Sequence, residues 1–379
     1  MVVSPPAKIM CLVGTRPECV KMAPVIAAMR AAPDMQVRVV STGQHKELIH
    51  QTLGIFGIEP DVDLAVMTAN QSLAALSARI FDRLDPLLVD EAPDMLLAQG
   101  DTASVMVAAL NSFFRKIPFG HVEAGLRTGD LQNPFPEELN RVVAGIAADI
   151  HFAPTQSSRL NLLREHVPDE RIHVTGNTVI DALKWVTAKP LACEFPRDKS
   201  RRLILVTAHR RENFGVPFER ICAALRQLHD ELTDAEFVYP VHPNPNVRSV
   251  VMPALSDLPR FHLIDPVDYL TMAGLLQAAS VIVTDSGGIQ EEAPALAKPV
   301  LVLRHETERP EAVDAGVARL VGTDPATIIE EVRRVWTDQD AYRSMASGIS
   351  PYGDGHAAGR IVAACRDFLS RRREGAAGR

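Results

Sequence analysis

Cysteine is scarce in this chain, with five in 379 residues. The five are odd in number, far apart in sequence and without a C-x-x-C pair, which argues against a disulfide framework and against a zinc site. Each is expected to be a small buried side chain with a reduced thiol, as in a cytosolic protein. Cys11, Cys19, Cys222 and Cys365 fall in expected strands or helices, and Cys193 falls in an expected linker.

Long apolar runs and basic blocks are absent as well. No stretch of about 18 apolar residues occurs, so the sequence predicts no membrane-spanning helix. The first residues, MVVSPPAKIMCLVG, lack the basic start and apolar core of a signal peptide, which favours a cytoplasmic location. The net charge is −7 and no cluster of lysine and arginine stands out, so we expect no nucleic-acid partner.

The motifs of two common kinds of cofactor site are also missing. The turn after the first expected strand reads GTRPE (residues 14–18) rather than G-x-G-x-x-G, so a Rossmann-like topology here does not imply a nicotinamide cofactor. The histidines form no H-x-x-x-H or H-x-H pair, which gives a metal site little support. We therefore expect neither an organic cofactor nor a metal.

What the chain does have is a regular alternation of short apolar strands and helices. This alternation predicts an α/β fold with parallel sheets, and the length allows two domains. We expect a first domain at 1–170, a second at 171–356, and a last helix within 357–379 that crosses back to the first domain. Ligands bind at the carboxyl ends of parallel strands, so the domains are expected to face each other across a cleft. The expected strands are 8–13, 37–41, 95–98, 117–122, 150–153, 172–174, 202–207, 236–240, 261–264, 280–284 and 300–303. The expected helices are 17–32, 46–56, 71–84, 157–165, 218–232, 269–278, 289–296, 326–336, 338–346 and 357–373.

One stretch, SVIVTDSGGIQEEAPALAKPVLVL at 280–303, reads as strand, glycine turn, helix and strand. Gly287 and Gly288 allow a tight turn with no Cβ beside a bound group. The helix that follows begins with unpaired N–H groups, which bind phosphate, and the Ser286 hydroxyl can add a donor. Glu292, one turn into the helix, is within reach of a sugar hydroxyl. The alternative is a plain turn in which the Asp-Ser pair before the glycines caps the helix.

Two cations follow the first strand. Arg16 and Lys21 lie in the first turns of a helix, whose positive end they do not stabilise. They are therefore expected to meet an anion. A salt bridge to Glu18 explains them equally well from the sequence alone.

Three carboxylates stand at expected strand ends or close to one. Asp101 follows the strand at 95–98, Glu123 follows the strand at 117–122, and Glu137 comes directly after a proline at the start of a helix. Helix capping, salt bridges and the helix dipole are the ordinary explanations for each one taken singly. Two of them at neighbouring strand ends favour acid–base chemistry on a neutral group such as a sugar.

The loops of the second half are rich in cations and histidine. His209 and Arg210 follow the strand at 202–207, His242 lies between a strand and prolines, and Arg309 follows the strand at 300–303. With the glycine turn, such side chains suit a diphosphate. No serine, cysteine or lysine stands out as an activated nucleophile.

Eleven motifs occur in order across nearly the whole chain and carry a family resemblance. They are GTRPE, TGQH, QGDT, HVEAGLRT, PFPEELNR, GNTVIDA, AHRRENFG, VHPNPNV, DSGGIQEEA, ERPEAV and PYGDG. With these motifs the chain resembles the bacterial non-hydrolysing UDP-N-acetylglucosamine 2-epimerases. The resemblance implies a GT-B fold, no metal or nicotinamide, a homodimer, and interconversion of UDP-N-acetylglucosamine and UDP-N-acetylmannosamine.

The resemblance also implies roles for single positions. Ser286, Gly287 and Gly288 match the phosphate cradle, and Glu292 matches a ribose-binding glutamate. Arg16, Lys21 and Arg309 match cations that hold the diphosphate or sugar, and Asp101, Glu123, Glu137 and His209 match the catalytic set. Gln44 and His242 match residues with which some relatives bind a second UDP-sugar as an activator.

The implied mechanism fits this inventory of residues. The C2 proton of an N-acetyl sugar is very weakly acidic until the anomeric C–O bond breaks and an oxocarbenium ion forms. Cations and the glycine turn would stabilise the departing UDP, and Asp101 and Glu137 would be the proton-transfer pair. Glu123 would hold the sugar or support the oxocarbenium ion, and His209 would contact the diphosphate.

Three other activities remain open from the sequence. A hydrolysing 2-epimerase would let water add to the glycal intermediate and release N-acetylmannosamine. A relative could act on a UDP-diacetamido sugar. A GT-B glycosyltransferase would transfer the sugar to an acceptor, but it would not need three acids on the edge of the first domain.

Overall fold

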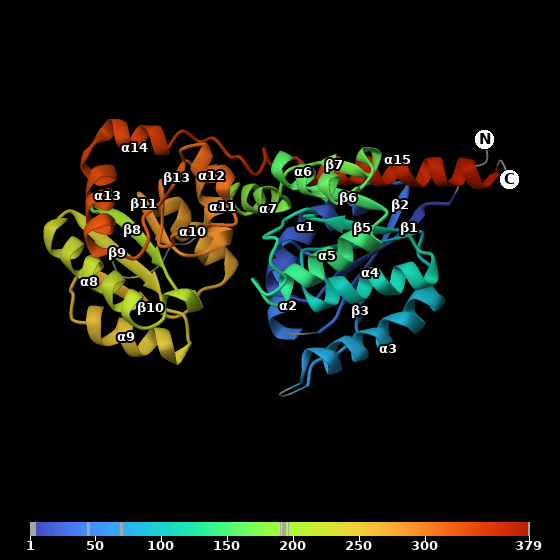
Figure 1. The fold of residues 1–379 in the computed structure, drawn as a ribbon, viewed down its shortest axis with the longest axis horizontal. Coiled ribbons are helices and arrows are strands. Elements are labelled where there is room, and N and C mark those ends of the chain that lie inside the picture. Colours follow the sequence, from blue (N-terminus) through green and yellow to red (C-terminus); the bar gives the residue numbers. More distant parts are fainter. Residues whose placement is uncertain are drawn as a thin grey trace. The chain divides into compact units, whose positions relative to one another are not determined.

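The computed structural model describes residues 5–43, 46–68, 71–189, 191, 195 and 197–377. The chain divides into two compact units, one formed by Met1–Ala182 with Tyr352–Arg379 and the other by Leu183–Pro351. Each unit contains one parallel sheet with helices packed around it (Figure 1). Two doubly wound α/β units in one chain are the GT-B architecture that the sequence predicted.

The sheet of the first unit has seven parallel strands in the order β3-β2-β1-β4-β5-β6-β7. Its central strands are continuous runs of buried residues, as expected for a sheet covered on both faces; all five residues of β4 are buried. The strands are β1 (Ala7–Val13), β2 (Met35–Ser41), β3 (Val62–Asp63), β4 (Met95–Gln99), β5 (Phe119–Val122), β6 (Ile150–Ala153) and β7 (Ile172–Val174). The helices are α1 (Arg16–Arg30), α2 (Lys46–Ile55), α3 (Leu73–Glu91), α4 (Ala103–Arg115), α5 (Glu137–Ala147), α6 (Gln156–Arg164) and α15 (Ala357–Ala377). Helix α7 (Thr178–Thr187) spans the boundary, because the first unit ends at Ala182 and the second begins at Leu183.

The expected boundary at residue 170 needs correction. Strand β7 pairs with β6 in the sheet of the first unit, so this unit continues to Ala182. Helix α15 belongs to the same unit, where it packs against α1. An exposed ion pair joins Arg366 of α15 to Asp34 at 2.6 Å.

The second unit has six parallel strands in the order β10-β9-β8-β11-β12-β13. Its core packs the apolar faces of β8, β9 and β11 against α8, α9 and α13, with Phe218, Phe237 and Tyr239 among the largest fully buried side chains. The strands are β8 (Arg202–Thr207), β9 (Ala235–Pro240), β10 (Phe261–Ile264), β11 (Val281–Thr284), β12 (Val300–Val302) and β13 (Ala318–Leu320). The helices are α8 (Val216–Glu231), α9 (Pro245–Leu255), α10 (Tyr269–Ala278), α11 (Gly287–Ala295), α12 (Pro310–Asp314), α13 (Pro325–Thr337) and α14 (Gln339–Met345).

Each sheet has one point at which the strand order reverses. In the first unit this point lies between β1 and β4, and in the second between β8 and β11. Loops that leave these strand pairs at their carboxyl ends diverge to opposite faces and leave a crevice, which is where ligands of doubly wound sheets bind. The GTRPE and QGDT loops therefore meet in one unit, and the AHRREN and DSGG loops meet in the other.

Several elements differ from the expected ones. Helix α3 was expected to end at residue 84 and continues to Glu91, because Leu84 and Leu88 extend the buried stripe begun by Leu76 and Ile80. The sequence pattern did not predict α4, because apolar residues cover most of the surface of this helix and obscure its helical period. It also missed β3, α9, α12 and β13, which are short or begin among prolines.

The cysteines lie where the sequence placed them. Cys11, Cys19, Cys222 and Cys365 are buried and free, and burial raises the pKa of each thiol, to about 12 for Cys11. Cys193 lies outside the described residues. No helix in the described ranges combines the length and apolar character needed to cross a lipid bilayer.

Candidate active site

Glu18 joins the two loops at the strand reversal of the first unit. It sits one turn into α1, and its Oε2 accepts hydrogen bonds from the backbone N–H groups of Gly14 and of Thr15, the latter at 3.0 Å. The hydroxyl of Thr102, in the QGDT loop, donates to Oε1 at 2.6 Å. Burial raises the pKa of Glu18 to about 7, against the effect of these hydrogen bonds.

This arrangement bears on Arg16, for which a salt bridge to Glu18 was the alternative explanation. Both oxygens of Glu18 are already engaged by Gly14, Thr15 and Thr102. Arg16 stands at the first position of α1 and is half-buried. It lies at the strand reversal of the first unit, and its expected contact with an anion stays a prediction.

Glu123 is held in an unusual backbone conformation at the end of β5. Its φ is +64°, in the left-handed region that a residue with a side chain seldom adopts. Lys21 of α1 forms an ion pair with Oε1, and the side-chain amide of Asn177 donates to the same oxygen at 2.8 Å. The amide of Gln99 donates to Oε2. Each of these three donors interacts favourably with a negatively charged carboxylate at this position.

Asp101 lies next to this cluster, after β4. Its Oδ2 accepts a hydrogen bond from Arg141 of α5 at 2.6 Å, and its backbone oxygen accepts one from the Asn140 amide at 2.9 Å. Burial raises the pKa of Asp101, which the Arg141 guanidinium opposes. The charges of Glu123 and Glu137 raise the pKa of Asp101 further, so both carboxylates interact electrostatically with Asp101.

The two acids that open α5 have different surroundings. Glu138 is buried, and its Oε1 accepts the backbone N–H groups of Thr128 and Gly129, both at 3.0 Å, which ties the loop after β5 to α5. Glu137 is half-buried, and no hydrogen bond or ion pair to it occurs among the described residues. Glu138 therefore has a structural role, and Glu137 is the acid of the pair that can act on a ligand.

In the second unit, the glycine turn begins α11 as expected. Ser286 is the residue before the helix, and its hydroxyl does not cap it. A Cβ on Gly287 would lie 3.2 Å from Cζ of Arg309 and 3.4 Å from a terminal guanidinium nitrogen of Arg210. A Cβ on Gly288 would meet no protein atom within 4 Å. The turn therefore presents an open helix start beside two guanidinium groups, the arrangement expected for a phosphate group.

Two carboxylates hold the Arg309 guanidinium in place. Its Nε donates to Glu291 of α11 at 2.9 Å, and a terminal nitrogen donates to Glu308 at 3.3 Å. Although burial of Glu308 opposes ionisation, hydrogen bonds from Arg304 and the nearby cations lower its pKa to about 2. Glu292, the expected ribose contact, is buried one residue beyond Glu291.

His209 stands at the strand reversal of the second unit, after β8. Its imidazole stacks on that of His242, with ring centroids 5.2 Å apart and planes inclined by 12°. Burial lowers the pKa of His209, the Asp285 carboxylate raises it, and His242 and Arg210 lower it again, for a net lowering. His242 is exposed, and its Nδ1 accepts the backbone N–H of Asn244 at 3.2 Å.

A comparison with known proteins identifies the family. The model of the UDP-N-acetylglucosamine 2-epimerase family matches residues 27–366. The chain belongs to this family. It is 48% identical over 371 residues to the UDP-N-acetylglucosamine 2-epimerase of Salmonella typhimurium, an alignment that covers 95% of this chain and 99% of that protein.

Solved structures of 2-epimerases share the fold. The UDP-GlcNAc 2-epimerase of Neisseria meningitidis, whose crystal structure has UDP-GlcNAc bound, is 42% identical to this chain, with a TM-score of 0.88. The match covers 95% of this chain and 100% of that one. The glycotransferase of kitacinnamycin is 13% identical with a TM-score of 0.62, covering 97% of this chain and 99% of that one. The second likeness concerns the fold alone.

At or beside the strand-end loops of each unit, the structure places several residues that the sequence pattern did not single out. Each lies inside a quoted motif, but its side chain is positioned by contacts between distant loops. They are Glu18, Gln99, Arg141, Asn177 and Asp285. Gln44, expected at a second UDP-sugar site, lies outside the described residues. Among the described residues, no group of three His, Cys, Asp or Glu side chains could hold a metal ion.

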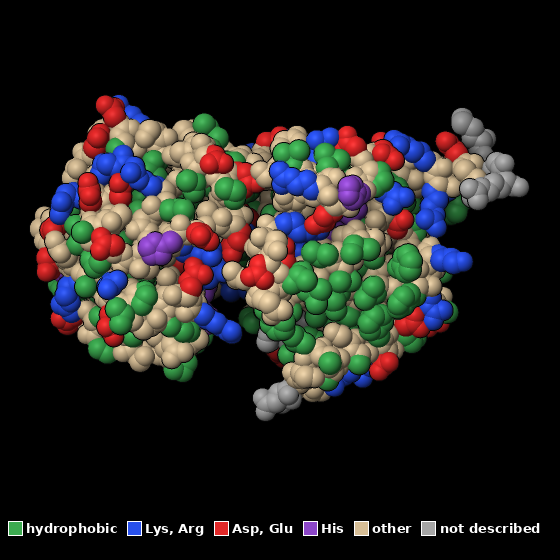
Figure 2. Space-filling view, in the orientation of Figure 1, with side chains coloured by type: hydrophobic (Ala, Val, Ile, Leu, Met, Phe, Trp, Pro, Cys, Tyr) green, Lys and Arg blue, Asp and Glu red, His purple; other side chains and the backbone are tan. Residues whose placement is uncertain are grey.

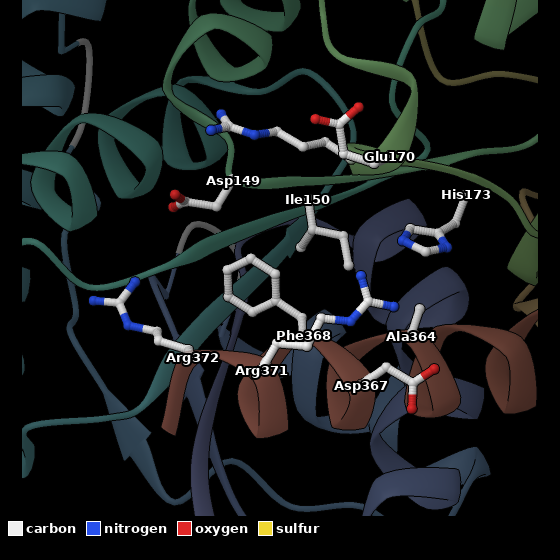
Figure 3. Close-up of a pocket in the computed structure, with 10 residues that line it drawn as sticks. Asp149, Ile150, Glu170, His173, Ala364, Asp367, Phe368, Arg371 and Arg372 are labelled. Carbon is white, nitrogen blue, oxygen red and sulfur yellow. The ribbon is translucent and has the colours of Figure 1, made fainter. Parts of the chain in front are cut away.

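A pocket of about 390 Å³ in the first unit lies away from these loops. It is lined by the starts of β6 and β7 and by one side of α15, so it opens at the amino ends of the strands. Figure 3 shows Phe368 directed toward Ile150, and Arg371 and His173 also line this pocket. Because the 2-epimerase motifs follow the carboxyl ends of the strands, this pocket is separate from the candidate active site.

Proposed function

We propose that this chain catalyses the reversible, non-hydrolysing epimerisation of UDP-N-acetylglucosamine at C2 to UDP-N-acetylmannosamine. The observation that carries the proposal is that the two strand reversals present different functional groups. One presents the carboxylates Asp101, Glu123 and Glu137, and the other presents an open helix start beside Arg210 and Arg309. Membership of the 2-epimerase family supports the same assignment.

The first step is departure of UDP. The anomeric C1–O bond breaks, UDP keeps the electron pair, and C1 becomes part of an oxocarbenium ion. Arg210, Arg309 and the N–H groups at the start of α11 stabilise the charge that develops on the diphosphate. Ser286 and His209 add hydrogen-bond donors, Arg16 and Lys21 add positive charge, and Glu292 holds the ribose.

The second step is proton transfer at C2. The oxocarbenium ion acidifies the C2–H bond, a carboxylate takes the proton, and a C1=C2 double bond forms. Another carboxylate then returns a proton to the opposite face, and UDP adds again at C1. Because the reaction runs in both directions, each member of the pair is a base in one direction and an acid in the other.

Asp101 and Glu137 form that pair. Asp101 is suited to holding a proton because burial and the neighbouring carboxylates raise its pKa. Glu137 is suited to exchanging a proton with the substrate because it forms no hydrogen bond or ion pair with the described residues. Lys21, Gln99 and Asn177 already contact the Glu123 carboxylate, which suits it to stabilise the oxocarbenium ion instead.

The test is incubation with UDP-N-acetylglucosamine in D₂O, followed by proton NMR. Epimerisation predicts UDP-N-acetylmannosamine with deuterium at C2, and deuterium also in the recovered substrate. Free N-acetylmannosamine with UDP would instead assign the chain to hydrolysing 2-epimerases. Binding of UDP without exchange would contradict the proposed substrate and favour a UDP-diacetamido sugar or a glycosyl transfer.

We also propose that the chain forms a homodimer through an apolar surface of the first unit. Large apolar side chains are exposed on α4 and α5, among them Phe113, Phe114, Leu139 and Ile146, the last 81% exposed. Figure 2 shows this surface as a continuous apolar area over α4 and α5. Apolar areas of this kind on soluble proteins mark interfaces.

His242 remains the described residue proposed for contact with a second UDP-sugar.

A further inference from the structure

Asp285 joins the two loops at the strand reversal of the second unit. Its side chain is 0% exposed at the end of β11. Its Oδ2 accepts the backbone N–H groups of His209 at 2.9 Å and Arg210 at 2.8 Å, and the side-chain amide of Asn213 at 3.1 Å. The expected alternative, a cap on α11, is wrong, because this carboxylate is turned toward the neighbouring loop.

The other oxygen of Asp285 has no such partner. Oδ1 is buried and accepts no hydrogen bond from the described residues. It lies 3.7 Å from Nδ1 of His209, which is beyond hydrogen-bond distance and within the range of an ion pair. A buried carboxylate oxygen is costly to leave without a donor, and Nδ1 of His209 can donate to it when that nitrogen carries a proton.

We propose that Asp285 is a positioning residue for His209. Its Oδ2 fixes the backbone of the His209–Arg210 loop, and its Oδ1 accepts the Nδ1 proton of His209 when substrate is bound. The imidazolium form is thereby held with its Nε2–H directed to donate a hydrogen bond to the leaving diphosphate, while the neutral ring keeps its proton on Nδ1. The proposal rests on the proposed function, in which His209 contacts that group.

Among the described residues of this unit, three charged or titratable groups act on His209, and their effects on its pKa have opposite signs. Asp285 favours the imidazolium form, whereas His242 and Arg210 disfavour it. Burial disfavours it as well. Asp285 is therefore the one group among them that keeps His209 able to carry positive charge while an anion departs.

The direct test is NMR of the wild-type protein with ¹⁵N-labelled histidine and saturating UDP. The His209 signals are assigned by their loss in His209→Gln. We expect the neutral ring to carry its proton on Nδ1, because a carboxylate accepts from that nitrogen. A neutral ring protonated on Nε2 would overturn the proposal. This measurement needs no turnover, so its outcome is separate from that of the epimerisation assay.

The second test is Asp285→Asn, which keeps the size of the side chain and removes its charge. We expect the pKa of His209 to fall by about 1 and the alkaline limb of the kcat–pH profile to move with it. If Asp285 only braced the loop, its replacement would expose His209 to water and raise that pKa instead. A rise or an unchanged value would therefore overturn the proposal.

The matched control is Thr207→Val. It removes a buried hydroxyl that lies 2.6 Å from that of Thr284, at the ends of the same two strands, without changing a charge. We expect the pKa of His209 to stay at its wild-type value in this variant. If Thr207→Val moved the pKa as far as Asp285→Asn does, loosening of the strand ends would explain both results. If Asp285→Asn does not fold, the wild-type tautomer still decides the question.

Discussion

At the scale of single residues, buried carboxyl groups hold the strand-end loops together, although burying a carboxyl group without hydrogen bonds is unfavourable. Glu18 and Asp285 are each buried at a strand reversal, and each accepts three hydrogen bonds. Asp285 receives all three from the loop after β8, whereas Glu18 receives two from its own loop and one from Thr102 after β4. Burial of a carboxylate is unfavourable, and the bonds offset this cost only when the loops are in place. Such residues couple the order of the loops to the protonation of a side chain.

The first prediction concerns Glu18 and the pH dependence of stability. Its pKa is about 7 in the folded chain and 4.5 as the ordinary value, so the folded state binds the proton more tightly. Its contribution to stability is complete below the lower value and is lost as the pH rises toward the higher one, by at most about 3 kcal/mol. In Glu18→Gln this loss is absent, so urea unfolding should show a flatter pH dependence between these values. Parallel curves for the two proteins, with exposed Glu59→Gln as the control, would contradict the burial argument.

The second prediction concerns the proton-transfer pair. Asp101→Asn and Glu137→Gln each remove a group that must gain and lose a proton, so kcat should fall on the order of a hundredfold to ten-thousandfold. UDP binding should remain close to wild type, because neither side chain belongs to the unit that holds the phosphate turn. Steady-state epimerisation and calorimetric UDP titration measure the two quantities, and Glu59→Gln serves again as the control. A near-native rate for either variant would remove that residue from the pair.

At the scale of elements, the start of α11 shows how two adjacent glycines serve different purposes. Gly287 leaves room for the guanidinium groups of Arg210 and Arg309. Gly288 has open space where its side chain would be, and its backbone is not in the left-handed region. The fold therefore does not require glycine at position 288, whereas the proposed contact with a phosphate group would.

The third prediction follows from this difference. Gly288→Ala places a methyl group in the open space and should stabilise the helix by about 0.5 kcal/mol, because alanine is the better helix former. The same methyl group should raise the Kd for UDP about tenfold, the equivalent of one lost hydrogen bond. Thermal unfolding and calorimetry measure these opposite effects. The control is Gly54→Ala in α2, where a Cβ also meets no atom within 4 Å and UDP binding should not change. Unchanged UDP affinity in Gly288→Ala would contradict the phosphate site.

At the scale of the whole molecule, the apolar surface on α4 and α5 is the feature that a monomer does not explain. Ring contacts join Phe81, Phe113 and Phe114 along α3 and α4. The helices of this layer pack against one another, with Phe81 partly buried against the core and Phe113 and Phe114 exposed. Covering this surface with a second copy would remove it from water.

The fourth prediction is that Ile146→Arg abolishes dimer formation. A buried arginine without a partner in a symmetric apolar interface destabilises association, and both copies carry the change. Sedimentation velocity at micromolar concentration should show a dimer for the wild type and a monomer for the variant. Ile349→Arg, at another exposed isoleucine in the second unit, should remain a dimer. A wild-type monomer under these conditions would contradict the proposed homodimer.

The sequence predicted most strands because buried parallel strands are short apolar runs bounded by turn residues. The expected bounds agree with the structure for β6, β7, β8, β10 and α10. It did not predict α4, in which buried residues lie on most sides, or the true end of the first unit. The pairing of β7 with β6 assigns it to the first sheet, and no local pattern carries that information.

The sequence by itself determined the family, the two doubly wound units and the loops that carry chemistry, because motifs and hydrophobic periods are local properties. The tertiary structure decided which loops are neighbours, since strand order is set by pairing between distant segments. That order brings Glu18 to Thr102, Glu123 to Asn177 and Asp285 to His209. It also distinguishes Glu138, which accepts two backbone hydrogen bonds within the fold, from Glu137, which is proposed to act on the substrate. Burial and neighbouring charge act through these contacts, so the protonation of the site is a property of the folded chain.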